Sequence, residues 1–309
     1  MLENYNEKSL KSIGWFILHC LIFASISILT KYIMQFEYNG NSISIFQILG
    51  MQTLFGTIFL LILRRDIFRP FPAKKSLVIH FVRALLWVAG TILFFLSLSS
   101  LPLPKTMALS FSTPLFTIIL AILILKEILY RHYVIAIIFG FVGMLIVIRP
   151  GINSFEPASL MVILACFLWS FTDIIIKHMG KLEKNATITW FNAFFSFLLI
   201  TPLMIAFWVP ISLTQFMLLL VLGMLYISNL MALTYSYRIG ELTLIQPFAF
   251  TQLLFVSILS FILFNELISI TTILGSGFII CGASVIAHNE RKKRKEWLAY
   301  RIGRKIIAK

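Results

Sequence analysis

The chain has 309 residues, of which 60% are hydrophobic and only 12% are charged, and its mean hydropathy is +0.96. A water-soluble fold of this size is excluded, because it needs far more polar surface to cover its exterior. The net charge of +14 lies largely in loops and in the segment from Arg291 onward, directly beside apolar runs. Cations in that position indicate contact with anionic membrane lipids and not with nucleic acid.

Ten apolar runs are long enough to cross a bilayer as helices, which need about 20 residues each. Helices are favoured over strands because every backbone group then finds its hydrogen-bond partner within its own segment. The sequence therefore predicts an all-α integral membrane protein. Its ten transmembrane helices are predicted at 14–34, 43–63, 77–99, 104–125, 132–149, 157–178, 187–208, 214–237, 242–264 and 270–288.

Lys and Arg residues gather in alternate loops, which predicts the orientation of the chain. The basic loops follow the second, fourth, sixth and eighth predicted spans, and the segments 1–13 and 289–309 lie on the same side. The positive-inside rule makes this side the cytoplasm, so both termini are expected there, in a bacterial inner membrane. The first span is expected to serve as an uncleaved signal anchor, because no small-residue cleavage site follows it.

The two halves of the chain match when one is slid along the other, by 146 residues near their starts and by 139 residues further on. The matched pairs are Cys20 with Cys166, Lys31 with Lys177, Glu127 with Glu266, and Gly143 with Gly282. Each half, 14–149 and 157–288, contains five spans, and an odd number makes the second half insert upside down. Inverted repeats are a construction of secondary transporters. The two glutamates end corresponding spans, the fourth and the ninth.

Several motifs resemble those of a known family. The runs LACFLWSFTDIIIK (164–177), RALLW (83–87) and LPLPKTMALSFSTPLF (101–116) are similar to motifs of the drug/metabolite transporter superfamily, EamA type. The last run is especially close to the branch that holds S-adenosylmethionine uptake carriers. The resemblance covers nearly the whole chain and implies a layout of five plus five helices. It also implies a structural role for Glu127 and Glu266, which cap loops or pair with neighbouring cations. The chain departs from the family in its second span, where Gln47 and Gln52 stand in a stretch that often carries an Arg.

Polar residues within spans are costly, and they tend to face the protein interior or a water-filled cavity. Asp173 is the only acidic residue well inside a predicted span. Two interpretations are open. Asp173 holds a cationic substrate group or exchanges a proton, or it forms a local pair with Lys177, four residues later on the same helix face.

Aromatic and amide side chains of the central spans are further candidates for substrate contact. An aromatic face attracts a sulfonium or ammonium group by a cation–π interaction, worth roughly 2 kcal/mol when desolvated. The full predicted set of substrate-binding residues is Asp173, Trp169, Trp87, Tyr235, Asn229, Gln246, Gln252 and Ser110.

Pro114 and Pro247 lie in corresponding spans of the two halves, and each removes a helical hydrogen bond and frees a carbonyl. Such a break is tolerated in lipid only where protein groups or cavity water satisfy the backbone. Hydroxyl and amide side chains surround both prolines. The breaks are therefore predicted to form a polar cavity wall, with ordinary packing between helices as the alternative.

The sequence contains no phosphate-binding Gly-rich loop, no metal-ligand spacing and no nucleophile with a base, so no enzyme, cofactor or metal is expected. We predict a secondary transporter that moves a small polar metabolite by alternating access. The leading substrate is S-adenosylmethionine, taken up by exchange. An exporter of amino acids or drugs is the alternative within the same superfamily. An uncoupled channel or a lipid-handling membrane protein is the alternative of another class.

Overall fold

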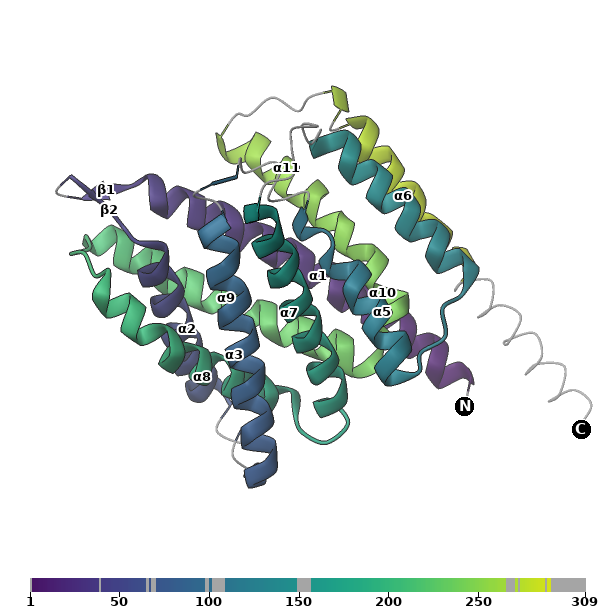
Figure 1. The fold of residues 1–309 in the computed structure, drawn as a ribbon, viewed down its shortest axis with the longest axis horizontal. Coiled ribbons are helices and arrows are strands. Elements are labelled where there is room, and N and C mark those ends of the chain that lie inside the picture. The colour runs from purple at the N-terminus through teal and green to yellow at the C-terminus, as the bar shows by residue number, and fades with distance from the viewer. Residues whose placement is uncertain are drawn as a thin grey trace, which may run out of the picture.

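The computed structural model describes residues 2–38, 40–64, 67, 71–97, 100–101, 109–148, 157–264, 270–271, 273–286 and 288–289. In this part of the chain, helices pack side by side into a bundle (Figure 1). They are α1 (Leu2–Gln35), α2 (Ile45–Leu63), α3 (Lys74–Ser97), α5 (Thr113–Leu125), α6 (Arg131–Ile148), α7 (Pro157–Met179), α8 (Asn185–Ala206), α9 (Leu213–Ile239), α10 (Leu242–Ile245), the 3₁₀ helix η1 (Gln246–Phe250) and α11 (Thr251–Phe264). A further helix, Ile273–Ile286, lies near the end of the described chain.

Seven helical segments among the described residues are long and apolar enough to cross a membrane: α1, α2, α3, α7, α8, α9 and the run from α10 to α11. Three shorter apolar helices, Thr113–Leu125, Arg131–Ile146 and Ile273–Ile286, lie where the fourth, fifth and tenth spans were predicted. Each predicted span thus has a helix at its place, because long apolar runs leave the backbone no alternative in lipid. The count of ten crossings stays a prediction.

A small hairpin that the sequence did not indicate joins α1 to α2. Strand β1 (Glu37–Tyr38) pairs antiparallel with β2 (Asn41–Ser42), and Gly40 takes a positive φ of 75° in the turn. The hairpin projects from one end of the bundle (Figure 1). Ser44 then begins α2 as its N-cap, with its hydroxyl accepting a hydrogen bond from the backbone N–H of Phe46 at 3.2 Å.

The bundle is apolar outside and partly polar inside, which is the reverse of a soluble protein. Large aliphatic side chains such as Leu63 and Ile205 are 73% and 65% exposed. Gln47, Arg83 and Asn192, by contrast, are buried. An aliphatic exterior of this kind is suited to contact with lipid tails, whereas buried polar groups must find their partners within the protein.

The helices contact one another in matched pairs. Helix α1 packs on α9 and α3 packs on α7; α2 packs on α9 and α3 on α8; α1 packs on α11 and α5 on α7. Suppose that α1, α2, α3 and α5 correspond in this order to α7, α8, α9 and α11. The contact of α1 with α9 then corresponds to the contact of α7 with α3, and the other two pairs of contacts correspond in the same way. The contact between α2 and α8 corresponds to itself. This is the pattern expected of two intertwined repeats.

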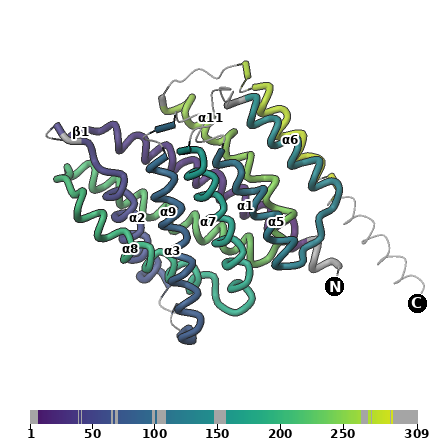
Figure 2. The backbone as a smooth tube through the Cα atoms, viewed as in Figure 1, coloured from purple at the N-terminus to yellow at the C-terminus, as the bar shows by residue number. Residues whose placement is uncertain are grey.

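Glycines let α6 and the helix Ile273–Ile286 lie close together at the edge of the bundle (Figures 1 and 2). A Cβ atom at Gly143 would lie 2.5 Å from the carbonyl oxygen of Gly275, and one at Gly282 would lie 2.8 Å from that of Ala136. Backbone atoms cannot yield as a flexible side chain can, so both positions require glycine.

Candidate functional site

Asp173 lies in the interior of the bundle, where four elements meet. It is 8% exposed on α7, and it accepts hydrogen bonds from Thr117 Oγ1 on α5 at 2.9 Å and from Gln246 Nε2 on η1 at 3.4 Å. Gln246 also donates to the hydroxyl of Tyr237 on α9 at 2.9 Å. The predicted residues Asp173 and Gln246 are therefore in direct contact.

The predicted alternative partner of Asp173 is engaged elsewhere. Lys177 donates from Nζ to the backbone carbonyl of Gly240. Asp173 and Lys177 are both described, and no ion pair joins them. The interpretation that Asp173 only neutralises Lys177 is therefore wrong, because contacts between helices take precedence over the local i, i+4 spacing.

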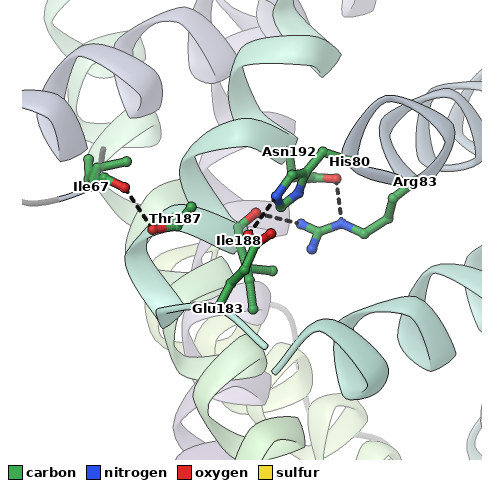
Figure 3. Close-up of polar contacts among 7 residues, drawn as sticks. All are labelled: Ile67, His80, Arg83, Glu183, Thr187, Ile188 and Asn192. Atoms are coloured by element: carbon green, nitrogen blue, oxygen red, sulfur yellow. Dashed lines mark hydrogen bonds and ion pairs between the residues drawn. The ribbon is translucent and has the colours of Figure 1, made fainter. Parts of the chain in front are cut away.

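Arg83 is the second buried charge of the bundle and is 1% exposed on α3. Its Nε donates to Asn192 Oδ1 at 2.9 Å and its Nη2 to the carbonyl of Ile188 at 3.2 Å, both on α8 (Figure 3). The remaining amino group, Nη1, is buried and makes no hydrogen bond. In the sequence, Arg83 was identified only as part of the motif RALLW (83–87). Its place nine residues into a 24-residue apolar helix is a signal that could have identified Arg83 as a site residue.

Arg83 and Asp173 lie on adjacent helices, near enough for their charges to interact. One helical turn from each lies a tryptophan, Trp87 on α3 and Trp169 on α7, and the indole Nε1 of Trp169 donates to the carbonyl of Trp87 at 3.3 Å. The ring of Trp87 also lies 6.1 Å from that of Tyr226, whose buried hydroxyl makes no hydrogen bond. Two opposite charges and an aromatic group thus share the interior without forming a direct ion pair.

The other predicted residues lie apart from this cluster. Asn229 donates to the backbone carbonyl of His19 at 2.9 Å and joins α9 to α1. Tyr235 packs edge-on against Trp15, with ring centroids 5.3 Å apart, near one end of the bundle. Gln252 is half-buried on α11 and is not among the described partners of Asp173. Ser110 contributes its carbonyl to a helix break.

The two prolines predicted to break helices differ in their positions. Near Pro247 the chain passes from α10 through the 3₁₀ turn η1, and Phe248 O accepts hydrogen bonds from Thr251 Oγ1 at 2.7 Å and Cys20 Sγ at 3.8 Å. Pro114 stands in the first turn of α5, so it begins this helix and does not interrupt it.

The freed carbonyls before α5 are satisfied in the same manner. Ser110 O accepts from Thr113 Oγ1 at 2.9 Å and from Cys166 Sγ at 3.5 Å, and the carbonyl of Leu109 lies 3.6 Å from the same sulfur. Cys20 and Cys166 are one of the pairs matched in the sequence at an offset of 146 residues, and Leu109 and Phe248 stand 139 residues apart. A thiol of the segment 14–149 thus contacts the chain near Pro247, and a thiol of the segment 157–288 contacts the chain before α5.

Glu127 has the structural, capping role that the family resemblance implied. Its carboxylate accepts the backbone N–H groups of Leu242 at 3.0 Å and Thr243 at 2.9 Å, at the start of α10. These donors have no partner within the helix. The matched Glu266 lies outside the described residues.

A second polar contact fixes the loop between α7 and α8. His80 Nε2 lies 2.8 Å from Glu183 Oε2, one helical turn before Arg83 (Figure 3). Burial acts to raise the pKa of Glu183, but hydrogen bonds from His80 and Ser76 and the positive charge of Arg83 outweigh it, so this pKa lies below its usual range. Glu183 is therefore ionised at neutral pH.

Comparison with known proteins identifies the family. The model of the EamA-like transporter family matches residues 10–149 and 157–287. The chain belongs to the EamA-like transporter family. It is thus a multi-pass membrane transporter of the drug/metabolite transporter superfamily, as its motifs indicated.

Curated relatives in this family carry two kinds of name. The chain is 28% identical over 286 residues to an S-adenosylmethionine uptake transporter of Rickettsia bellii (strain RML369-C), covering 91% of this chain and 94% of the relative. It is 27% identical to the S-adenosylmethionine uptake transporter of Rickettsia prowazekii (strain Madrid E), covering 92% and 94%. A riboflavin transporter of Brucella anthropi is 30% identical over 217 residues, covering 67% and 75%.

A solved crystal structure has the same fold. It aligns with a TM-score of 0.75 at 14% sequence identity, covering 93% of this chain and 98% of the other. At this identity the likeness concerns the fold alone.

Proposed function

We propose that this EamA-like transporter is a secondary carrier that takes up S-adenosylmethionine across a bacterial inner membrane by alternating access, with exchange as its mode. The observation that carries the substrate assignment is the buried pair Arg83 and Asp173, each held by neutral groups and each near an aromatic side chain. S-adenosylmethionine carries a carboxylate, an ammonium and a sulfonium group. The carboxylate is the partner for Arg83 Nη1, and Asp173 receives a cationic group.

The names of relatives give a second candidate, riboflavin. Riboflavin has no carboxylate and no cationic group at neutral pH, so it leaves both Arg83 and Asp173 without a charged partner. Burying a charge without compensation costs several kcal/mol. The charges of the site therefore favour S-adenosylmethionine.

Alternating access follows from the proposed architecture of ten spans in two inverted repeats, 14–149 and 157–288, with both termini in the cytoplasm. Three observations support it: the matched helix contacts, the two successive matches of the family model, and the thiol contacts near Pro247 and before α5. Two bundles of equal construction then rock about the central charges, exposing them first to one face and then to the other.

Uptake by bacterial cells that express the chain tests this proposal. Labelled S-adenosylmethionine is expected to enter saturably, with competition by its demethylated product and little competition by riboflavin or by decarboxylated S-adenosylmethionine. Riboflavin uptake would assign the second candidate. Absence of uptake of either compound, with the protein confirmed in the membrane, would direct the search to export of amino acids or drugs, and flux that never saturates would indicate a channel.

A further inference from the structure

Tyr226 is a buried tyrosine of α9 whose hydroxyl the packing of the helices does not explain. The residue is 4% exposed, and its hydroxyl makes no hydrogen bond with any residue that the structure describes. Buried hydroxyl groups nearly always have a partner, because leaving one without a hydrogen bond destabilises the fold. A phenylalanine would fill the same space without this disadvantage. The hydroxyl of Tyr226 therefore points to a partner from outside the chain.

The ring of Tyr226 is held by two other helices. Its centroid lies 6.1 Å from that of Trp87 on α3. On the side of α2, a Cβ atom at Gly56 would lie 3.0 Å from Tyr226 Cδ1, so the ring packs directly against the backbone of that helix. Because the ring is held on two sides, the position of its hydroxyl is fixed as well.

This hydroxyl belongs to the polar surroundings of Arg83. Tyr226 lies near the guanidinium of Arg83 and near the side chain of Asn192, which accepts the hydrogen bond from Arg83 Nε (Figure 3). Arg83 Nη1 is likewise buried and makes no hydrogen bond with the described residues. An N–H donor and an O–H donor, both without an acceptor among these residues, are thus close together in the interior.

The two donors come from different segments of the chain. Arg83 belongs to the segment 14–149 and Tyr226 to the segment 157–288, and their helices α3 and α9 both pack on α8. A ligand that accepts hydrogen bonds from both donors must offer two acceptor sites, and its negative charge must compensate Arg83. The two oxygens of a carboxylate meet these conditions, and such a ligand joins the two segments.

We infer that Tyr226 is a specificity-determining residue, whose hydroxyl donates to the same substrate carboxylate that Arg83 Nη1 binds. The inference rests on the proposed function, because S-adenosylmethionine supplies the carboxylate. Arg83 provides the compensating charge, and Tyr226 provides a neutral second donor that fixes the orientation of the carboxylate. An analogue without the carboxylate leaves both buried donors unpaired and is rejected for that reason.

Equilibrium binding to the purified full-length chain in detergent tests the inference. The probes are S-adenosylmethionine and decarboxylated S-adenosylmethionine, and isothermal titration calorimetry measures the Kd of each. In Tyr226→Phe the Kd of S-adenosylmethionine is expected to rise about tenfold, the effect of losing one hydrogen bond to a charged group. The Kd of the decarboxylated probe is expected to stay the same. A residue that only shapes the site would weaken the binding of both probes equally.

Thermal unfolding without ligand provides a second measurement that needs no substrate. Phenylalanine keeps the ring and removes the unpaired hydroxyl, so Tyr226→Phe is expected to raise Tm by about 2 °C or more. The matched control is Tyr32→Phe, because Tyr32 is a tyrosine of α1 that is 45% exposed. It is expected to leave Tm and both Kd values unchanged.

The outcomes distinguish this role of Tyr226 from the proposed function. A loss of affinity confined to S-adenosylmethionine, together with a higher Tm, supports the role. Unchanged binding of S-adenosylmethionine in Tyr226→Phe, or equal weakening of both probes, overturns it and leaves the proposed function in place. A lower Tm also overturns it, since the hydroxyl would then have a partner in the unliganded protein. If the unaltered chain does not bind S-adenosylmethionine, the proposed function and the role of Tyr226 are both contradicted.

Discussion

Asp173 and Arg83 each occupy the interior with hydrogen-bond partners that are neutral. An isolated buried charge costs several kcal/mol, and removing one partner of a buried charge pair typically costs 2–5 kcal/mol. A fold alone would be served as well by apolar side chains of similar volume. We therefore infer that these charges are kept for an external charged partner, which the transporter binds and releases in each cycle.

Replacing Asp173 with Asn is expected to lower transport on the order of 30-fold or more, the effect of losing about 2 kcal/mol of charge interaction. The amide oxygen still accepts the bond from Thr117, so the amount of folded protein in the membrane is expected to stay the same. Initial uptake rates, corrected for protein level, measure the loss. Glu7→Gln removes an exposed carboxylate and serves as the control. Uptake unchanged in Asp173→Asn would rule out its substrate role.

Glu183 gives a pH-dependent contribution to stability. Its folded pKa is below the value in the unfolded chain, so its contribution is fully present above about pH 4.3 and is lost as the pH falls through the folded pKa. Glu183→Gln is expected to lower Tm by about 2–4 °C at pH 7, with the difference shrinking toward pH 3. Thermal unfolding of both chains in detergent measures it, and a difference that grows in acid would contradict the assigned contact.

Residue-level chemistry was only partly predictable from the sequence. Asp173 was predicted as a site residue because a carboxylate within an apolar run is costly and needs a partner, and Gln246 because it stands beside Pro247. Arg83 was missed as a site residue, since it was interpreted only as part of a motif. The spacing of Asp173 and Lys177 predicted a contact that the structure does not contain. Lys177 donates instead to the carbonyl of Gly240 at the end of α9, and this contact between distant segments is not visible in the local sequence.

At the scale of helices, the length of each apolar run was sufficient to predict a helix at its place. The two prolines were predicted to break helices, but Pro114 proved to begin a helix and Pro247 to stand in a 3₁₀ turn. The hairpin between α1 and α2 was not predicted, because two-residue strands carry no detectable alternation. The contacts between helices were also not predictable, because they depend on packing between segments that are distant in the sequence.

The close approach of α6 and the helix Ile273–Ile286 predicts different effects for two Gly→Ala substitutions in that helix. Gly282→Ala forces a Cβ atom against the carbonyl of Ala136 at 2.8 Å, and it is expected to destabilise the chain by about 1–3 kcal/mol. Gly277→Ala, in the same helix, meets nothing within 4 Å and is expected to be neutral or stabilising. Thermal unfolding of the two variants compares them directly, and equal Tm values would refute the close contact.

At the scale of the whole molecule, the proposed topology assigns each loop to one face of the membrane. The hairpin and the loop between α7 and α8 are expected on opposite faces of the membrane, with the loop in the cytoplasm. In a Cys281→Ser background, Glu37→Cys is expected to react with an impermeant maleimide in intact cells. Lys181→Cys is expected to react only after permeabilisation, and the reverse pattern would invert the proposed orientation.

We propose that the transporter carries S-adenosylmethionine by exchange, with Arg83 binding its carboxylate. Counterflow in proteoliposomes preloaded with unlabelled S-adenosylmethionine tests this mechanism most directly. The expected result is a transient, saturable accumulation of label, reduced at least about tenfold in both Arg83→Gln and Arg83→Lys, because an ammonium group cannot reproduce the planar guanidinium fork. Accumulation that needs no preloading and rises linearly with concentration, or that is as strong in Arg83→Gln as in the unaltered chain, would contradict the account.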